Sequence, residues 1–258
     1  MPVPTPGPCL VVFTKPAIPG RVKTRLVGAE LAGPPGSPPR VVGRDEAAAL
    51  HAAFLGDLAE RLRADGAGTR FHVRVAWDIG ASTPLPPLPP ELAGLSRVDA
   101  VRQEGDDLGE RLHAALAAAA REHPVVAALG SDHPALDPAL LHRALAAVAE
   151  GGGADVALGP SEDGGYYLVA LARRAVHRRL FSGIDWSTGR VLRQTLARCR
   201  ELGLAVERLP VARDVDRADD LAALAGELAA GRGPDCPRTR RLLAGWGVLA
   251  APPVAAAG

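Results

Sequence analysis

The pattern of apolar and polar positions divides the chain into short apolar runs that alternate with longer amphipathic segments. The runs are rich in β-branched residues and are bounded by glycine or proline, which predicts buried strands. Strands are predicted at residues 9–13, 70–77, 96–105, 125–129 and 154–160, in the segment after Gly165, and at 204–210. Helical spacing predicts helices at residues 44–66, 107–123 and 186–203, and helices that begin near Asp137 and near Arg217.

Strands that alternate with helices predict an α/β fold with a mostly parallel sheet and helices on both of its faces. We find no internal repeat and no second block long enough for a separate core, so we expect one domain over residues 9–245 and a flexible tail over 246–258. The segment 28–43 is rich in proline and glycine and predicts an excursion on the surface. In parallel sheets, ligands bind beyond the carboxyl ends of the strands, so the loops after the strands carry the candidate chemistry.

Composition excludes several classes of function. The formal net charge is +1, which gives no overall field for a nucleic acid or an anionic membrane. The three cysteines are far apart and form no CxxC pair, so neither a disulfide framework nor a thiolate zinc site is expected. The N-terminus lacks the basic segment and long apolar run of a signal peptide, and no run reaches the ~18 apolar residues of a membrane span. We therefore expect a cytoplasmic protein.

The first loop concentrates positive charge in an unusual way. The chain has 30 lysines and arginines, yet its only two lysines both lie in this loop, which follows the first predicted strand. Lysine acts as a compact point charge and arginine can bind two oxygen atoms at once, so the loop is a candidate phosphate site, although a solvated basic loop explains the charge equally well. No GxxxxGK[ST] or GxGxxG motif is present, which disfavours a P-loop or a Rossmann dinucleotide site. The cationic residues are Lys15, Arg21, Lys23 and Arg25.

Two acidic segments are candidates for binding a metal. Asp132, in the sequence GSDHP, follows an apolar strand directly, and Mg²⁺ commonly takes one or two carboxylates together with substrate phosphates. Asp214 and Asp216 are separated by one residue, so in extended backbone only one of them faces a given site. The alternative is that Asp132 caps a turn and Asp216 caps the following helix. We interpret His133 as a polar residue at the rim.

Two further loops combine polar side chains with glycine. Asp163 precedes Gly164 and Gly165, which allow a ligand to approach the backbone closely, and Tyr166 follows them; a hairpin turn is the alternative. Trp186, Ser187 and Thr188 lie at a predicted helix start and suit packing or hydroxyl contacts with an anion. In QEGDDLGERL, residues 103–112, the acids Asp106 and Glu110 are better explained by a helix start. The chain contains no GxSxG or HExxH motif.

Taken in order, six segments resemble a known bacterial family. They are KPAIPGRVKTRL, QEGDDLGERL, GSDHPAL, GPSEDGGYYLVAL, LFSGIDWST and DVDRADDL, and the resemblance covers roughly residues 9 to 225. The set is similar to the selenodomain-associated transferases, glycosyltransferase-like proteins with a GT-A fold that are related to nucleotide-diphospho-sugar transferases. Two features depart from the family pattern: the excursion at 28–43 is longer, and His133 stands where a smaller Ser or Thr is common.

The resemblance implies a role for each segment. Lys15, Arg21, Lys23 and Arg25 are expected to hold nucleotide phosphates, and Asp132 is similar to the family's metal-binding aspartate. Asp163, with Gly164, Gly165 and Tyr166, resembles the acceptor or sugar loop, and Asp214 or Asp216 completes the metal site. We expect Asp132 and Asp163 to be catalytic. Trp186, Ser187 and Thr188 are expected to contact the substrate.

Two reactions fit such a site. In glycosyl transfer, an acceptor attacks the anomeric carbon of a nucleotide-sugar while Mg²⁺ or Mn²⁺ and the cationic side chains stabilise the leaving nucleoside diphosphate. In nucleotidyl transfer, a phosphorylated acceptor attacks the α-phosphate of an NTP and pyrophosphate leaves. Glycosyl transfer is favoured, with guanylyl or cytidylyl transfer as the alternative and a non-catalytic nucleotide-binding protein as the third hypothesis. The expected partners are a nucleotide-sugar or NTP and a small acceptor.

Overall fold

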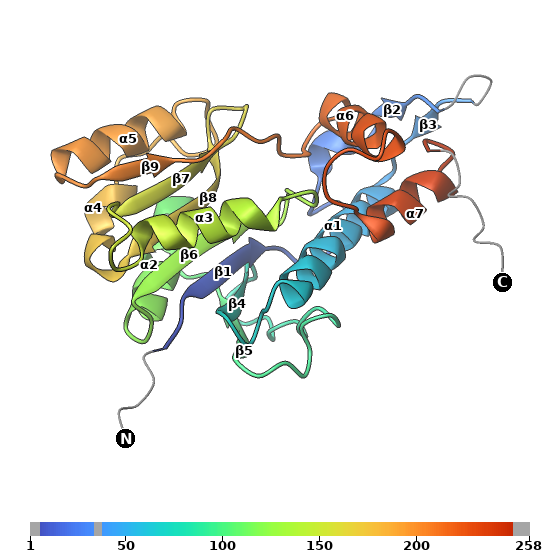
Figure 1. Cartoon of the computed structure of the whole chain (residues 1–258). Helices are drawn as coiled ribbons and strands as arrows, with labels where there is room; N and C mark the ends of the chain where they lie inside the picture. The colour runs from blue at the N-terminus through green and yellow to red at the C-terminus, as the bar shows by residue number, and fades with distance from the viewer. Residues whose placement is uncertain (1–5, 34–37, 250–258) are drawn as a thin grey trace. The chain divides into compact units, whose positions relative to one another are not determined.

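The computed structural model describes residues 6–33 and 38–249 of the chain (Figure 1). The fold divides into two compact units. Unit 1 contains the chain up to Pro16, Ala59–Ser131 and Asp137–Asp214, and unit 2 contains Ala17–Leu58, Asp132–Leu136 and the chain from Val215 onward. The sequence predicted one domain over residues 9–245, and that stays a prediction; each of the two units is described by itself.

A seven-stranded sheet forms the centre of unit 1, in the order β5-β4-β1-β6-β8-β7-β9. Its strands pair in parallel except for β8, which runs antiparallel to both β6 and β7. Strand β1 is buried along almost its whole length, as its uninterrupted apolar sequence predicts for a strand covered on both faces. The strands are β1 (Cys9–Thr14), β4 (His72–Trp77), β5 (Val98–Arg102), β6 (Val125–Gly130), β7 (Val156–Pro160), β8 (Tyr166–Ala172) and β9 (Val206–Arg208).

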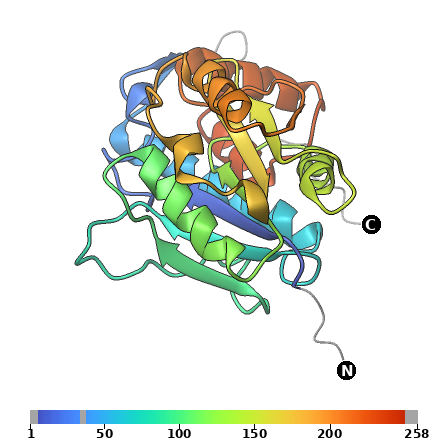
Figure 2. The ribbon, with the colours of Figure 1, turned by 90° about the vertical axis from the view of Figure 1, so that its left-hand side faces the viewer.

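Helices cover both faces of this sheet. The helices are α2 (Leu108–Ala120), α3 (Pro138–Val148), α4 (Arg178–Phe181) and α5 (Val191–Glu201), and a short 3₁₀ turn, η2, covers Arg173–Ala175. Apolar residues of α2, α4 and α5 share one core with alternate residues of the strands, while α3 packs on β6, β7 and β8. In Figure 2 the green helix α2 and the yellow-green helix α3 lie on opposite sides of the sheet. With both faces covered, the carboxyl edge of the sheet is the part where α/β sheets generally bind ligands.

Unit 2 is built around a second, separate apolar core. It contains α1 (Arg44–Ala64, whose first residues up to Leu58 belong to this unit), α6 (Ala218–Ala229), α7 (Pro237–Gly245), a 3₁₀ turn η1 (Thr24–Leu26) and the antiparallel strands β2 (Glu30–Leu31) and β3 (Arg40–Val41). The core includes Leu26, Leu50, Phe54, Leu221 and Leu243. Asp57, which is 2% exposed, accepts hydrogen bonds from the backbone N–H groups of Arg238 and Thr239 and so ties α1 to the start of α7.

The predicted fold class is confirmed, and the predicted strands and helices are confirmed with shifted boundaries. The helix expected from residue 186 begins at Val191, because residues 185–190 form a hydrogen-bonded loop instead. The excursion at 28–43 contains β2 and β3 and contributes the buried residues Leu31 and Val42; its residues 34–37 lie outside the described residues.

Several features were not predicted. They are the two short helices α4 and α7, the short strands β2 and β3, and the antiparallel direction of β8. Of the expected tail, Leu249 is buried and bonds back to Leu243, whereas residues 250–258 lie outside the described residues. Among the described residues, no helix combines the length and the apolar character needed to cross a membrane.

Candidate functional site

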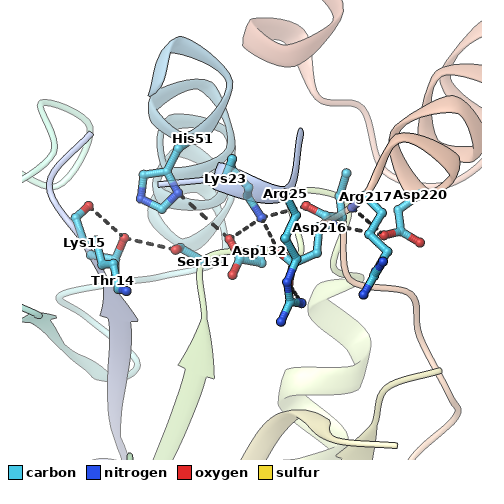
Figure 3. A network of polar contacts seen from close by, with 11 residues as sticks. Thr14, Lys15, Lys23, Arg25, His51, Ser131, Asp132, Asp216, Arg217 and Asp220 are labelled. Atoms are coloured by element: carbon cyan, nitrogen blue, oxygen red, sulfur yellow. Dashed lines mark hydrogen bonds and ion pairs between the residues drawn. The ribbon is translucent and has the colours of Figure 1, made fainter. Parts of the chain in front are cut away.

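Lys23 is the centre of a polar cluster in unit 2 (Figure 3). Its Nζ lies 2.6 Å from Asp132 Oδ1, 3.0 Å from Asp216 Oδ1 and 2.6 Å from the main-chain oxygen of Val215. The lysine side chain is only 2% exposed, and its Nζ also lies 5.3 Å from the centre of the Phe54 ring. A buried ammonium is tolerated here because two carboxylates, a carbonyl and an aromatic face replace the water that it loses.

The backbone of the first loop holds Lys23 in place. Lys23 itself has φ 47° and ψ 36°, a left-handed conformation that is uncommon for a residue with a side chain. The next residues form η1, and its Leu26 is buried in the core of the unit. Strain of this kind persists only where the surrounding structure enforces it, and it concentrates at functional sites.

Asp132 lies two residues after the end of β6, and a hydrogen bond to its backbone holds it in place. Its carbonyl accepts a hydrogen bond of 3.1 Å from the N–H of Val215, which brings the two acidic segments of the sequence together. Burial acts to raise the pKa of the Asp132 carboxyl group, but the Lys23 ammonium outweighs this effect and holds the pKa below its usual range. The carboxyl group is therefore ionised at neutral pH, and its side chain remains 42% exposed.

Two histidines accompany this carboxylate. His51 Nδ1 lies 3.9 Å from Asp132 Oδ1, and the side chain of His51 is buried. His133, expected at the rim, is 6% exposed, and burial lowers its pKa to about 4. At neutral pH the imidazole of His133 is therefore uncharged.

Asp216 faces Lys23 rather than capping the next helix. Its Oδ2 accepts a hydrogen bond of 3.3 Å from Arg25 Nη1, while Asp220 accepts the backbone N–H groups of Asp216 and Arg217 at the start of α6. Asp220, rather than Asp216, therefore accepts the backbone N–H groups at the start of α6. The side chain of Arg25 is 55% exposed, so much of its guanidinium is accessible to an anion.

The structure brings together only part of the expected metal and phosphate set. Of the two neighbouring aspartates, Asp216 meets Asp132 through Lys23, whereas Asp214 is half-buried and belongs to unit 1. Arg21 is exposed and has no ion pair among the described residues. Within residues 6–33 and 38–249, no group of three or more His, Cys, Asp or Glu side chains is arranged to hold a metal ion.

The donor chemistry of this cluster nevertheless fits a divalent ion. Asp132 Oδ1, Asp216 Oδ1 and the Val215 carbonyl oxygen all point to one position, which is held by the Lys23 ammonium. Hard oxygen atoms of this kind are the ligands that Mg²⁺ and Mn²⁺ select.

A second polar network lies at the carboxyl edge of the sheet in unit 1. Thr14, the last residue of β1, donates its hydroxyl proton to Ser131 Oγ at 3.0 Å, beyond the end of β6. Gln103, beyond the end of β5, donates from Nε2 to the carbonyl oxygens of Ala76 at 2.8 Å and Thr14 at 3.3 Å. These contacts fix the ends of neighbouring parallel strands, where the fold class binds its ligands.

Lys15 pairs with Asp78, whose backbone N–H donates to the carbonyl oxygen of Thr14 in this network. The Lys15 Nζ lies 3.4 Å from Asp78 Oδ2, and Arg111 Nη1 lies 3.0 Å from Asp78 Oδ1. Asp78 directly follows β4, and Arg111 lies in the first turns of α2. The side chain of Lys15 is 54% exposed and can reach a ligand at this edge.

The loop from Ser161 to Gly165 is shaped by its two glycines. Gly164 has φ +88°, and a Cβ there would lie 2.4 Å from the carbonyl oxygen of Gly189, so no larger residue fits without a shift. Asp163 Oδ1 accepts the N–H of Gly165 at 2.9 Å, and the carboxyl group remains on an exposed residue. The segment is therefore a turn into β8, as the hairpin alternative required, and it also presents Asp163 outward.

A ring contact between Trp186 and Tyr166 connects the two remaining predicted segments, 163–166 and 186–188, in unit 1. Their rings meet edge to face with centres 6.3 Å apart, and burial raises the pKa of the Tyr166 hydroxyl above its usual range. A Cβ on Gly109 would lie 2.6 Å from Trp186 Nε1, so the indole packs directly on the start of α2. Both rings serve packing in this state and are less available to a ligand than the sequence suggested.

The loop after Trp186 is held by several hydrogen bonds. Ser187 has φ 62°, and Thr188 Oγ1 donates to the carbonyl oxygen of Asp185 at 2.6 Å. The side chain of Asp185 in turn accepts hydrogen bonds from Arg190 and Gln194. Both Ser187 and Thr188 are exposed.

Sequence reasoning missed several members of the two networks. Asp78, Arg111, Gln103, Thr14 and Ser131 were not singled out, although Gln103 and Arg111 lie in a segment that was considered for its acids. The feature of the sequence that could have identified them is their position. Each lies at or just beyond the end of a predicted strand, or on the helix that follows such a strand. The helix-start interpretation of the same segment is confirmed, because Asp107 caps α2 by accepting the N–H of Glu110 at 2.8 Å and Glu110 accepts the N–H of Asp106 at 3.1 Å.

The strand order, the antiparallel β8 and the polar carboxyl edge define a protein with the nucleotide-diphospho-sugar transferase fold. The crystal structure of a proposed nucleotide-diphospho-sugar transferase from Desulfovibrio desulfuricans G20 is similar with a TM-score of 0.74 and 29% sequence identity, over 93% of this chain and 96% of that chain. Residues 69–188 match the family described as "Uncharacterized protein conserved in bacteria (DUF2064)". The resemblance inferred from the six segments is thereby confirmed at the level of fold.

More distant structures share the fold alone. A cytidylyltransferase from Leptospira borgpetersenii serovar Hardjo-bovis (strain JB197) has a TM-score of 0.50 and 14% identity, over 93% of this chain and 92% of that chain. The 4-diphosphocytidyl-2C-methyl-D-erythritol synthase of Anaerococcus prevotii DSM 20548 has a TM-score of 0.50 and 8% identity, over 84% and 95%. The comparison with curated proteins gave no match.

Proposed function

We propose that the protein is a transferase that uses a nucleotide-activated donor and moves a glycosyl group to a small acceptor. The observation that carries this proposal is the Lys23 ammonium held between Asp132 and Asp216. Asp132 lies two residues after β6, the central strand of a nucleotide-diphospho-sugar transferase fold. Together with a divalent ion, carboxylates preorganised in this way would stabilise a leaving diphosphate, and that reaction requires no covalent help from the protein.

The proposed phosphate contacts come from the cationic side chains of the first loop. Arg25 and Arg21 are exposed on unit 2, and Lys15 is exposed on unit 1, so each can bind an anion without first being uncovered. Lys23 differs because its ammonium is already satisfied by oxygen atoms of the protein. We therefore propose Arg21 and Arg25 on unit 2 and Lys15 on unit 1 as candidate first contacts of donor phosphates, while the Lys23 ammonium stays paired with the two carboxylates at that first step.

The proposed ion is Mg²⁺ or Mn²⁺, held by Asp132 and Asp216. When bound, such an ion neutralises the charge that develops on the departing nucleoside diphosphate. Asp132 is the primary ligand in this proposal because its side chain is partly exposed and ionised. Asp214 is kept as an additional candidate from the sequence.

The proposed acceptor residues lie in unit 1. Asp163 presents a carboxylate from the turn before β8 and would take the proton of the attacking acceptor hydroxyl. As the new bond to the anomeric carbon forms, the bond from that carbon to the diphosphate oxygen breaks, and the electron pair leaves with the nucleoside diphosphate. Gly164 and Gly165 allow the acceptor to approach the backbone. The exposed hydroxyls of Ser187 and Thr188 are proposed to contact the substrate, and Trp186 and Tyr166 to support that loop by packing.

Product analysis tests this proposal. The protein is incubated with Mn²⁺ and a set of nucleotide-sugars or NTPs, each with and without a mixture of small hydroxyl, thiol and phosphate acceptors. Acceptor-dependent release of a nucleoside diphosphate supports glycosyl transfer. Release of pyrophosphate from an NTP assigns nucleotidyl transfer instead, and binding without any product in either series contradicts enzymatic transfer.

A further inference from the structure

The Lys23 ammonium occupies an oxygen cage in unit 2. Three oxygen atoms surround it: Asp132 Oδ1 at 2.6 Å, the Val215 carbonyl oxygen at 2.6 Å and Asp216 Oδ1 at 3.0 Å. Two of these oxygens belong to carboxylates, so the cage carries two formal negative charges. The side of the ammonium toward Phe54 is closed by an aromatic ring, which attracts a cation without offering it a coordinating atom. The cage is a cation site, and the chain supplies its own cation.

The same oxygens are the atoms that a divalent ion would need. Mg²⁺ binds oxygen at about 2.0–2.1 Å and demands a near-octahedral arrangement, so the carboxylates would have to draw closer than they stand around Lys23. An ammonium and a dication cannot share the position, because like charges a few ångström apart repel strongly away from bulk water. An ion bound by both carboxylates therefore requires the ammonium to leave.

We propose that Lys23 is a tethered competitor of the divalent ion, which reaches both Asp132 and Asp216 only by displacing the Lys23 ammonium from between them. The inference rests on the proposed function insofar as that function needs the ion. It adds that the protein without substrate binds the ion weakly, because its own ammonium already fills the position. A donor diphosphate would offer the displaced ammonium a new anionic partner, so ion and nucleotide would bind together.

The fold limits which part of Lys23 can move. Its backbone is held in the left-handed conformation, and η1 follows it with Leu26 buried in the core. The flexible four-carbon side chain is therefore the part that exchanges partners, while the loop stays in place.

The competing explanation predicts the opposite change in metal affinity when Lys23 is removed. If Lys23 only orients the two carboxylates for the ion, removing it disorders the ligands and weakens metal binding. If Lys23 competes with the ion, removing it frees two converging carboxylates and strengthens metal binding. The two explanations are separated by the direction of one change in affinity.

The experiment titrates the whole protein with Mn²⁺ alone and follows free Mn²⁺ by electron paramagnetic resonance. We expect Lys23→Met to bind Mn²⁺ at least tenfold more tightly than the wild type, and Asp216→Asn added to Lys23→Met to reverse the gain. Lys15→Met is the matched control, because it removes the chain's only other lysine and should leave the affinity within twofold. An affinity of Lys23→Met that equals or falls below that of the wild type overturns the proposal.

A measurement on the wild type covers the case in which Lys23→Met does not fold. The chain has only two lysines, and their exposures differ sharply, at 54% for the Lys15 side chain and 2% for that of Lys23. Reductive methylation read by peptide mass spectrometry should label Lys15 and spare Lys23 without metal. Saturating MnCl₂ should make Lys23 reactive; continued protection of Lys23 overturns the proposal. Lys23→Gln provides a second, polar variant for the Mn²⁺ titration.

This design separates the inference from the proposed function. Neither measurement contains a donor, an acceptor or turnover, so tighter Mn²⁺ binding by Lys23→Met stands even if no transfer reaction is found. Conversely, product formation together with unchanged Mn²⁺ binding supports the transferase and rejects competition by Lys23.

Discussion

Lys23 Nζ and Asp132 Oδ1 lie 2.6 Å apart, although one residue follows the first strand of the sheet and the other follows the fourth along the chain. The contact joins the first loop, which carries both lysines of the chain, to the aspartate that follows strand β6. It also explains how a lysine side chain that is only 2% exposed is accommodated in unit 2: the Asp132 carboxylate supplies the counter-charge that burial of the ammonium demands.

Asp132 is expected to be essential for turnover but not for folding. Asp132→Asn keeps the size of the side chain and removes the charge, so we expect kcat/KM to fall by about a hundredfold or more. Circular dichroism and steady-state kinetics measure the two effects. Asp219→Asn, at an exposed acidic position of α6, is the control and should keep wild-type kinetics. Normal turnover in Asp132→Asn would remove the carboxylate from the proposed chemistry.

Asp57 is expected to dominate the stability of unit 2. Its carboxylate is buried and accepts three hydrogen bonds, including one of 2.6 Å from Thr239 Oγ1. Asp57→Ala leaves these donors without partners, so the free energy of unfolding should fall by about 3 kcal/mol in urea titrations. The exposed Asp235 serves as the comparison, and Asp235→Ala should cost less than about 1 kcal/mol. Equal costs for the two variants would contradict this account.

Gly109 is expected to tolerate no side chain. A Cβ there would meet the carbonyl oxygen of Phe181 at 2.4 Å and Trp186 Nε1 at 2.6 Å. Gly109→Ala should therefore lower the free energy of unfolding by about 1–3 kcal/mol and change the fluorescence of Trp186. Gly226, a helical glycine of α6, is the matched control, because the described residues place no atom within 4 Å of the position that its Cβ would take, apart from the helix's own nearby backbone and the two chain neighbours. Gly226→Ala should stabilise the protein by up to about 1 kcal/mol, and a loss in both variants would show that local packing is not the cause.

Asp99 should make stability depend on acidic pH. Burial acts to raise its pKa, but the hydrogen bonds from Arg74, at 2.9 Å to Oδ1 and 2.8 Å to Oδ2, outweigh it and lower the pKa below its usual range. Because the unfolded-state pKa is about 3.9, the stabilisation is complete above that pH and is lost as pH falls through the lower folded-state value. The side chain of Asp99 is 41% exposed, so the contribution is about 1 kcal/mol or less.

Urea titrations of the wild type and Asp99→Asn across this acidic range measure that contribution. The stability difference between the two proteins should be largest at neutral pH and should vanish below the folded-state pKa. A difference that stays constant with pH would contradict the ion pair as its source.

The alternation of apolar runs and helices was sufficient to predict the α/β fold and most of its elements. It could not predict that β8 runs antiparallel, because an apolar run has no direction until its neighbours and connections are known. The short helices α4 and α7 were missed for a different reason. Four residues at Arg178–Phe181 cannot show a period, and α7 depends on the buried Asp57 for its start.

The candidate site was predictable where chemistry and strand position coincide. Lys23, Asp132 and Asp216 were selected for their charge near predicted strand or helix ends, and the fold brings them together. Their mutual arrangement was not predictable, because nothing in the sequence indicates that Lys23 points inward to carboxylates. Asp78 and Arg111 were missed because their pairing across β4 and α2 exists only in the folded chain.

The most direct test of the central claim is a thermal-shift screen of nucleoside diphosphates and nucleotide-sugars, with and without Mn²⁺, on the wild type and Asp132→Asn. A ligand present at 100 times its Kd stabilises a folded protein by about 2.7 kcal/mol, which is readily detected. The account predicts that at least one nucleotide raises the melting temperature of the wild type in the presence of Mn²⁺ and that Asp132→Asn loses the shift. No shift with any nucleotide, or an equal shift in Asp132→Asn, would contradict it.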